Sequence, residues 1–172
     1  ISGNQDRARF ISYANGDVKF DEDPKLAGWD REIGEAGNKA YKRLSMLHAF
    51  NYSVPGIPCI YYGDEIGLPG ANDPDNRRMM RFENWNSKQQ QLFNQVAELN
   101  QLRESEMPLL FGSTHCYVEG NLLIIRREYF EKVIVTVFNL SEEALEINLP
   151  FEFEAKRSLN KVRSGLLEDG ME

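Results

Sequence analysis

The sequence predicts an α/β part, with helices around a buried strand, followed by a small antiparallel β part. Two observations support this fold class. Residues 40–104 run in the order helix, apolar strand, long loop and helix, which is typical of a βα-barrel or a doubly wound sheet. Beyond residue 107, short runs rich in β-forming residues follow one another about every ten residues, as in the antiparallel meander of a small sandwich.

The first helix is predicted to begin at Ala40 and to end by Val54. Pro55 sets that limit, because a proline disfavours helical backbone in the residue before it. The next segment, residues 56–63, reads GIPCIYYG and predicts a strand buried on both faces. The apolar positions of the helix recur at spacings of three: Tyr41, Leu44, Leu47 and Phe50.

A second helix is predicted from Ser87, which forms a capping box with Gln90, to about Glu104. The β part then offers four short runs separated by turn residues, at 114–120, 121–129, 132–140 and 144–150. We place the boundary between the two parts near residues 111 and 112, which gives 1–111 and 112–172. The apolar stripe of the second helix is Leu92, Phe93, Val96, Leu99 and Leu102.

Length and charge restrict the classes of partner. A chain of 172 residues corresponds to one domain, or to one domain and part of another. The net charge of −7 repels phosphate backbones and anionic lipid, so neither nucleic acid nor a membrane is a predicted partner. No apolar run approaches the roughly 20 residues of a membrane span.

The cysteines and histidines predict no metal centre. Cys59 and Cys116 lie in apolar stretches, and two buried free thiols are favoured over a disulfide. Neither His48 nor His115 has a second histidine or a cysteine at metal-ligand spacing. His48, on the first helix, is interpreted as a structural side chain.

Three motifs resemble one family. Residues 4–6 read Asn-Gln-Asp, residues 56–65 read GIPCIYYGDE, and residues 73–78 read DPDNRR. Together they resemble the C-terminal third of the α-amylase superfamily of glycoside hydrolases, especially its neopullulanase and cyclomaltodextrinase-like members. The resemblance implies that residues 1–111 are the last two βα units of a (β/α)8 TIM barrel. Residues 112–172 would be an antiparallel β-sandwich-type C-terminal domain, and both ends of the chain look cut.

The resemblance also assigns roles to the first motif. Asp6 would be the transition-state stabiliser, which hydrogen-bonds sugar hydroxyls beside the reacting carbon as positive charge develops on the ring. Gln5 stands where the family has histidine; its amide still donates a hydrogen bond but is always neutral. Loss of an optional charge-assisted hydrogen bond is expected to weaken transition-state binding by roughly tenfold or more without abolishing it. Asn4 and Arg9 would support the site, with Arg9 positioning Asp6 or the loop. A purely structural pairing of Asp6 with Arg9 is the alternative.

Two further positions are candidate substrate ligands. Asp73 and Arg77 would hydrogen-bond a glucose unit a few subsites from the cleavage point; a loop-stabilising salt bridge is the alternative reading. Asp64 and Glu65 are interpreted as structural. Trp29, in the long polar loop 12–39, is either a sugar-stacking platform or the hydrophobic anchor of that loop, and the anchor is favoured.

The resemblance places the nucleophile and the general acid upstream, on strands four and five of the barrel. Residues 1–172 alone are therefore expected to be inactive, whereas the parent enzyme would cleave α-1,4 or α-1,6 bonds of starch-type oligosaccharides with retention. Its partners would be an α-glucan and the upstream part of the barrel. No cofactor is expected in residues 1–172, and the sequence leaves open whether the parent protein binds calcium. It also leaves the compartment open, with a periplasmic or secreted location slightly favoured.

Two other functions stay open. The first is a non-catalytic carbohydrate-binding or transporter-associated homologue, which Gln5 mildly favours. The second treats the β part as an independent carbohydrate-binding module. Its aromatic residues alternate with apolar ones, so core packing is their favoured role: Tyr117, Tyr129, Phe130 and Phe138.

Overall fold

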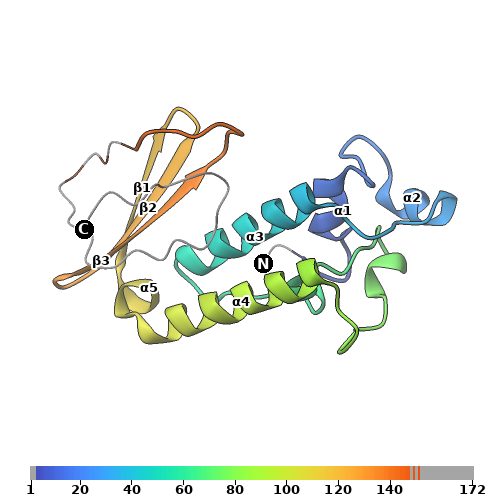
Figure 1. Ribbon diagram of the computed structural model, residues 1–172, viewed down its shortest axis with the longest axis horizontal. Helices are drawn as coiled ribbons and strands as arrows, with labels where there is room; N and C mark the ends of the chain where they lie inside the picture. The colour runs from blue at the N-terminus through green and yellow to red at the C-terminus, as the bar shows by residue number, and fades with distance from the viewer. Residues whose placement is uncertain (1–2, 148, 150, 152–172) are drawn as a thin grey trace.

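The computed structural model describes residues 3–147, 149 and 151. A three-stranded sheet lies at one end of the molecule and the short helices α1 and α2 lie at the other, with α3 and α4 side by side between them (Figure 1). The elements in chain order are α1 (Phe10–Asn15), α2 (Pro24–Asp30), α3 (Asn38–Ser53), η1 (Asp64–Ile66), η2 (Asp75–Arg77), α4 (Ser87–Ser105), α5 (Met107–Phe111), β1 (Ser113–Glu119), β2 (Leu122–Tyr129) and β3 (Lys132–Asn139).

Both long helices are confirmed, and each ends for a local reason. Helix α3 ends at Ser53, two residues before Pro55, as the proline requires. Helix α4 has a capping box, but the capping pair is Asn86 and Gln89, one position before the predicted pair. The Asn86 side chain accepts from the backbone N–H of Gln89 at 3.0 Å, and the Gln89 side chain accepts from the N–H of Asn86 at 3.0 Å.

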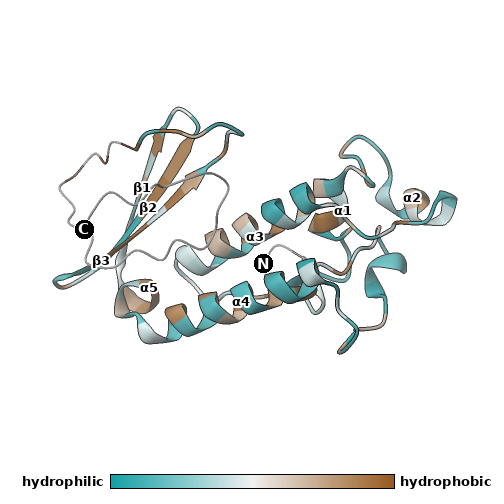
Figure 2. Cartoon of the chain, viewed as in Figure 1, coloured by the Kyte–Doolittle hydropathy of each residue, from teal (hydrophilic) through white to brown (hydrophobic). Residues whose placement is uncertain are grey.

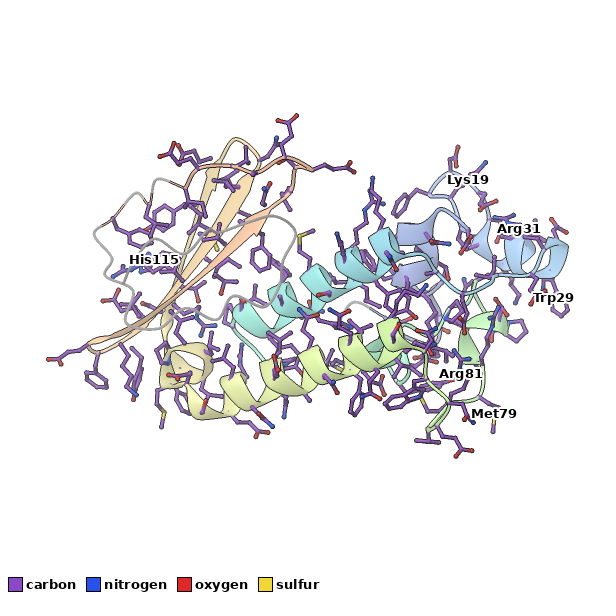
Figure 3. The ribbon with its side chains drawn as sticks, viewed as in Figure 1. Lys19, Trp29, Arg31, Met79, Arg81 and His115 are labelled. Carbon is purple, nitrogen blue, oxygen red and sulfur yellow. The ribbon has the colours of Figure 1, made fainter. Side chains whose placement is uncertain are left out.

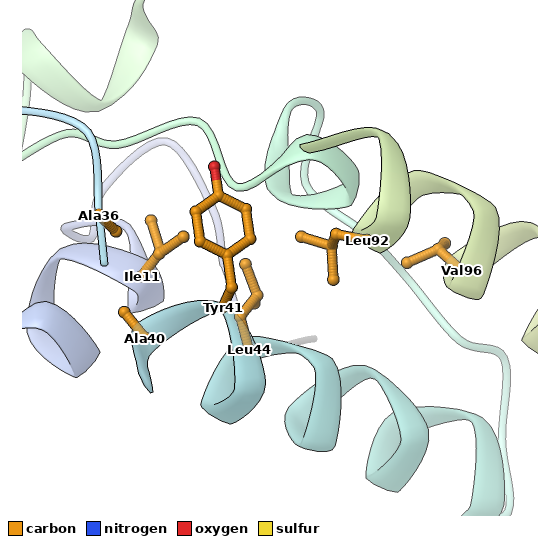
Figure 4. Close-up of a cluster of buried hydrophobic side chains, with 7 residues drawn as sticks. All are labelled: Ile11, Ala36, Ala40, Tyr41, Leu44, Leu92 and Val96. Carbon is orange, nitrogen blue, oxygen red and sulfur yellow. The ribbon is translucent and has the colours of Figure 1, made fainter. Parts of the chain in front are cut away.

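The core of the helical part joins α1, α3 and α4 (Figure 4). Tyr41 and Leu44 of α3 meet Leu92 and Val96 of α4, while Ile11 of α1 closes the cluster. These side chains lie three or four residues apart on their helices, so each helix buries one face. The complete cluster consists of Ile11, Ala36, Ala40, Tyr41, Leu44, Leu92 and Val96.

The predicted strand at residues 56–63 is wrong. None of these residues belongs to a strand, Ile57 is 94% exposed, and Cys59 is exposed as well. A parallel strand is held by hydrogen bonds to neighbouring strands. Within the described part of the chain no segment pairs with this one, so apolar composition alone does not make it a strand. A parallel sheet is likewise not formed there, and the barrel stays a prediction.

The antiparallel meander is confirmed for three of its four runs. β1 pairs with β2, which pairs with β3, and β2 contributes the buried Ile124 and Ile125. Figure 2 shows apolar residues concentrated along these strands, whereas the loops at the opposite end are mostly hydrophilic. The fourth run, 144–150, forms no strand at its described positions; residues 148 and 150 lie outside the described residues, as does the predicted continuation at 152–172. The sandwich and the domain boundary stay predictions.

Both cysteines are free, as predicted, but the prediction that they are buried is wrong, because both are exposed. Cys59 lies in the segment that does not form a strand. Cys116 lies on β1, which pairs with β2 alone among the described strands and whose residues are mostly exposed. No described helix is long and apolar enough to cross a membrane.

Two buried arginines join the sheet to the end of α3. Arg103 of α4 donates to the carbonyl oxygens of Tyr52 (2.6 Å), Val54 (2.8 Å) and Gly56 (2.6 Å). The last carbonyls of a helix lack partners within the helix, and they carry partial negative charge that attracts cations. Arg103 therefore caps α3 from a neighbouring helix.

Arg127 of β2 completes this junction. It donates to the carbonyl oxygens of Ser53 (3.0 Å) and Gly112 (3.1 Å), so one side chain ties α3 to the start of the sheet. Burial lowers the pKa of both arginines, and the charge of Arg103 lowers that of Arg127 further. An apolar cluster of Ala49, Ile125 and Phe138 packs at the same junction.

Candidate functional site

The turn that carries Asp6 is shaped by two asparagine side chains. Within the turn, Asn4 Oδ1 accepts from the backbone N–H of Asp6 at 2.8 Å. From the second loop, the fully buried Asn76 donates through Nδ2 to the carbonyl oxygens of Gln5 (2.9 Å) and Arg7 (2.7 Å). A longer hydrogen bond from the same Nδ2 to the Asn4 carbonyl, at 3.3 Å, completes the set. The backbone around Asp6 is therefore fixed by residue 76, some seventy positions later.

The structure brings four of the predicted site residues together. Arg77 lies between two carboxylates: its Nε is 3.0 Å from Asp73 Oδ1, and its Nη2 is 3.7 Å from Asp6 Oδ1. Gln5 Nε2 donates to Asp6 Oδ2 at 3.1 Å. Lys25 adds a second cation, with its Nζ 3.8 Å from Asp73 Oδ2.

This group of side chains faces solvent. The side chains of Asp6, Arg77 and Asp73 are 72%, 47% and 37% exposed. Exposed ion pairs stabilise a fold by about 0–1 kcal/mol, so the Asp73–Arg77 bridge contributes little as a loop-stabilising element. A carboxylate can accept about four hydrogen bonds and a guanidinium can donate five. Most of that capacity is free here for the hydroxyl groups of a ligand.

Arg9 acts on the site from beneath, without contacting Asp6. It is 1% exposed and donates to the carbonyls of Tyr62 (2.6 Å, from Nη1) and Asn76 (3.0 Å, from Nε). Its Nη1 also forms a 2.9 Å ion pair with Asp64 Oδ1. The guanidinium lies 4.2 Å from the ring centre of Tyr61. Arg9 thus positions the loop, and one of its links to the Asp6 turn runs through Asn76.

Burial shifts the pKa values of the groups packed around Arg9. Burial raises the pKa of Asp64 to about 6, although the charge and hydrogen bond of Arg9 pull that pKa downward. His48 Nε2 lies 3.1 Å from the backbone carbonyl of Asp64, and burial lowers the pKa of His48. Since a carbonyl only accepts, Nε2 carries the hydrogen, and the lowered pKa favours the neutral ring. His48 is a buried, hydrogen-bonded side chain, as interpreted from the sequence.

Trp29 does not anchor its loop. It lies on α2 with 69% of its surface exposed, at the same end of the molecule as the site loops (Figure 3). The favoured interpretation is therefore wrong, because the loop is held by other contacts. Asp23 caps α2 by accepting from the N–H of Lys25 at 2.8 Å. His115 lies at the opposite end, on the sheet (Figure 3).

Sequence reasoning missed Asn76, which organises both loops. Its only signal in the sequence is its place inside the 73–78 motif, in which the resemblance gives roles to Asp73 and Arg77 alone. No group of three or more histidine, cysteine or acidic residues that could hold a metal ion occurs among residues 3–147.

The chain is similar to several curated enzymes. It is 31% identical to the cyclomaltodextrinase of Thermoanaerobacter pseudethanolicus, over 95% of this chain and 24% of that protein. It is 28% identical to the cyclomaltodextrinase of Geobacillus thermopakistaniensis, over 93% of this chain and 24% of the relative. It therefore spans about a quarter of the length of these relatives. No family model matches the chain.

Solved structures give the same result. The maltogenic amylase of S. marinus superposes with a TM-score of 0.64 at 28% identity, over 86% of this chain and 18% of that one. An Anoxybacillus α-amylase superposes with a TM-score of 0.66 at 29% identity, over 88% of this chain and 29% of that one. By its motifs, its relatives and its structure, the chain belongs to the α-amylase superfamily of glycoside hydrolases, within which it resembles cyclomaltodextrinases and maltogenic amylases.

Proposed function

We propose that the full-length protein is an α-glucan hydrolase that cleaves α-1,4 or α-1,6 glucosidic bonds of starch-type oligosaccharides with retention of configuration. The observation that supports this most strongly is the row formed by Asp6, Arg77 and Asp73. Three predicted sugar-binding groups, separated by up to 71 positions in the sequence, meet at an exposed surface, where Arg77 lies within ion-pair distance of both carboxylates.

In this proposal Asp6 stabilises the transition state. Its carboxylate accepts hydrogen bonds from sugar hydroxyls beside the reacting carbon, and these bonds strengthen as the ring becomes oxocarbenium-like. The negative charge also offsets the positive charge that develops on the ring. Arg77 and Gln5 each approach one oxygen of this carboxylate, and its other lone pairs face solvent.

Arg77 and Asp73 hold a glucose unit of the substrate that lies farther from the cleavage point along the glucan. A planar guanidinium can bridge two neighbouring hydroxyls, and a carboxylate can accept from two. Because Arg77 contacts both Asp6 and Asp73, a sugar bound at one position is aligned with the other. Asn4 supports Asp6 through its turn, while Arg9 supports both loops from below.

The reacting carboxylates come, in this proposal, from a part of the barrel outside residues 1–172. Retaining glycosidases place a nucleophile and a general acid about 5–5.5 Å apart, and the family resemblance assigns both to earlier strands. Residues 1–172 alone would then be inactive. The same resemblance implies no cofactor in this segment and leaves calcium in the rest of the protein open.

The test is an assay of the full-length protein with maltooligosaccharides, cyclodextrin and pullulan. We expect reducing-sugar release, and proton NMR at early times should show products of the α-configuration. Products of the β-configuration would contradict the retaining mechanism. A folded protein that releases nothing from any of these substrates would contradict the hydrolase and favour the non-catalytic carbohydrate-binding homologue.

A further inference from the structure

An exposed tryptophan stands beside the candidate site. Trp29 of α2 is 69% exposed, although indole is among the side chains that gain most from burial. Helix α2 packs inward through Ala27, which is 2% exposed. A large aromatic surface left in water next to polar ligand groups is typical of a binding surface.

Helix α2 is held firmly against the loop that carries Asp73. The backbone N–H of Asn72 donates to the carbonyl of Pro24 at 3.1 Å. The two segments touch at Gly28, where an added Cβ would lie 2.9 Å from the Cβ of Ala71 and 3.3 Å from the Cβ of Asp75. A larger residue at position 28 would push the two segments apart, so the close packing of α2 against this loop depends on glycine there.

A surface depression of about 340 Å³ lies between α2 and this loop. That volume falls within the range of about 300–1,000 Å³ seen for small-ligand sites. Its wall combines an indole and a proline with two cations, an amide and a carboxylate, which matches the apolar C–H face and the hydroxyl rim of a pyranose. The lining residues are Lys25, Gly28, Trp29, Asn72, Pro74, Asp75 and Arg78.

Lys25 links the depression to the group formed by Asp6, Arg77 and Asp73. Lys25 lines it and also lies 3.8 Å from Asp73, which pairs with Arg77. Arg78 is held rigidly by two 2.9 Å hydrogen bonds to the Asp75 carboxylate. A glucan chain that leaves the Asp73–Arg77 position in this direction therefore meets Lys25 and then the indole.

We infer that Trp29 forms an outer glucan-binding subsite, in which a glucose unit stacks on the indole and its hydroxyls bond to Lys25 or Arg78. This inference rests on the proposed α-glucan specificity. The C–H face of the sugar is attracted by the negative face of the indole π-system. The subsite would favour chains long enough to reach from Asp6 past Asp73 to α2, and shorter chains would not use it.

The test compares Trp29→Ala with wild type in the full-length protein, using maltotriose and maltoheptaose. We expect kcat/KM and calorimetric affinity for maltoheptaose to fall about tenfold, with maltotriose unaffected. Trp29→Phe should retain most of the affinity. Leu26→Ala is the matched control, since Leu26 is 58% exposed on the same helix but does not line the depression.

Unchanged maltoheptaose affinity in Trp29→Ala would overturn the subsite, as would an equal loss for both substrates. Calorimetry separates this inference from the proposed hydrolysis. If wild type hydrolyses nothing but binds maltoheptaose in a Trp29-dependent way, the subsite stands and the hydrolase fails. If hydrolysis is present and Trp29→Ala behaves as wild type does, the hydrolase stands and the subsite fails.

Discussion

Both ends of the molecule bury arginine side chains, but the hydrogen-bond and ion-pair partners of these arginines differ between the two ends. At the loop end, Arg9 pairs with the carboxylate of Asp64 and lies against the ring of Tyr61. At the sheet end, Arg103 and Arg127 donate to backbone carbonyls. The first arrangement fixes irregular loops that carry exposed acidic groups, while the second closes the end of a helix.

This difference shows which neighbours distinguish the two roles. A buried arginine bonded to helix-end carbonyls completes hydrogen bonding that the helix itself leaves unmade. A buried arginine bonded to loop carbonyls and to a carboxylate fixes loops that lack the regular backbone hydrogen bonds of a helix or sheet. Substitution of Arg9 should therefore affect stability and activity together. Substitution of Arg103 or Arg127, at the junction of α3 with the sheet, should affect stability alone.

The largest effect is expected for Arg9→Met. It leaves the Asp64 carboxylate buried without its cation, and removing one partner of a buried ion pair costs about 3–5 kcal/mol. The loops that hold Asp6 and Asn76 should also loosen, so hydrolysis per folded molecule should fall. Chemical denaturation and reducing-sugar assays of the full-length protein measure the two losses. Normal activity in a destabilised Arg9→Met protein would remove the link between Arg9 and the site.

A smaller effect is expected for Arg103→Met. It leaves neutral carbonyls at the end of α3 without a protein donor, with a cost of about 2–3 kcal/mol. The free energy of unfolding should drop while kcat/KM for maltoheptaose stays at the wild-type value. A comparable fall in kcat/KM would show that the two ends are coupled and would contradict the division of roles.

The pH dependence of stability should identify the buried pair at the loop end. The pKa of Asp64 is raised from 3.8 to about 6, so the folded state binds its proton more tightly than the unfolded state does. The stability contributed by this proton is fully present below about pH 4 and is lost as the pH rises through 6. The lowered pKa of His48 has the opposite sign, since its contribution is lost as the pH falls below its ordinary value.

Asp64→Asn separates these two contributions, because His48 is common to both proteins. The stability of wild type relative to Asp64→Asn should be greater at pH 4 than at pH 7 by on the order of 2 kcal/mol. Denaturation of both proteins at unit steps of pH gives this difference directly. A stability difference that does not vary with pH would mean that the pKa of Asp64 is not raised in the folded protein.

The smallest effect is expected for Asp73→Ala. Asp73 is 37% exposed and pairs with Arg77 at the surface, so unfolding should change by less than about 1 kcal/mol. Loss of its hydrogen bonds to a glucose unit should raise KM for longer maltooligosaccharides severalfold and leave kcat nearly unchanged. An unchanged chain-length profile would reduce Asp73 to a loop residue.

The sequence predicted the elements whose signals are local. Helices α3 and α4 follow from apolar spacing and the limit at Pro55, and the three strands follow from alternating β-formers between turns. Helix α2 was missed inside the long loop, although Asp23 and Pro24 are a normal N-cap and first-turn proline. The polar content of its surroundings concealed that signal.

Features that depend on distant partners could not be predicted. The apolar run at residues 56–63 has strand composition, but strands need neighbours, and composition does not supply them. Asn76, Arg103 and Arg127 bond to carbonyls far away in the sequence, and such bonds leave no periodic pattern. The resemblance named Asp6, Asp73 and Arg77; their mutual distances come from the structure.

The most direct test of the central claim, that Asp6 serves catalysis at a surface built by buried loop contacts, is hydrolysis of maltoheptaose by full-length Asp6→Asn. We expect kcat to fall by about 10²–10³-fold with unchanged unfolding, because one electrostatic stabiliser of the transition state is lost. Asp21→Asn, an exposed aspartate in the long loop, is the matched control and should behave as wild type does. Near-normal turnover in Asp6→Asn would contradict the account.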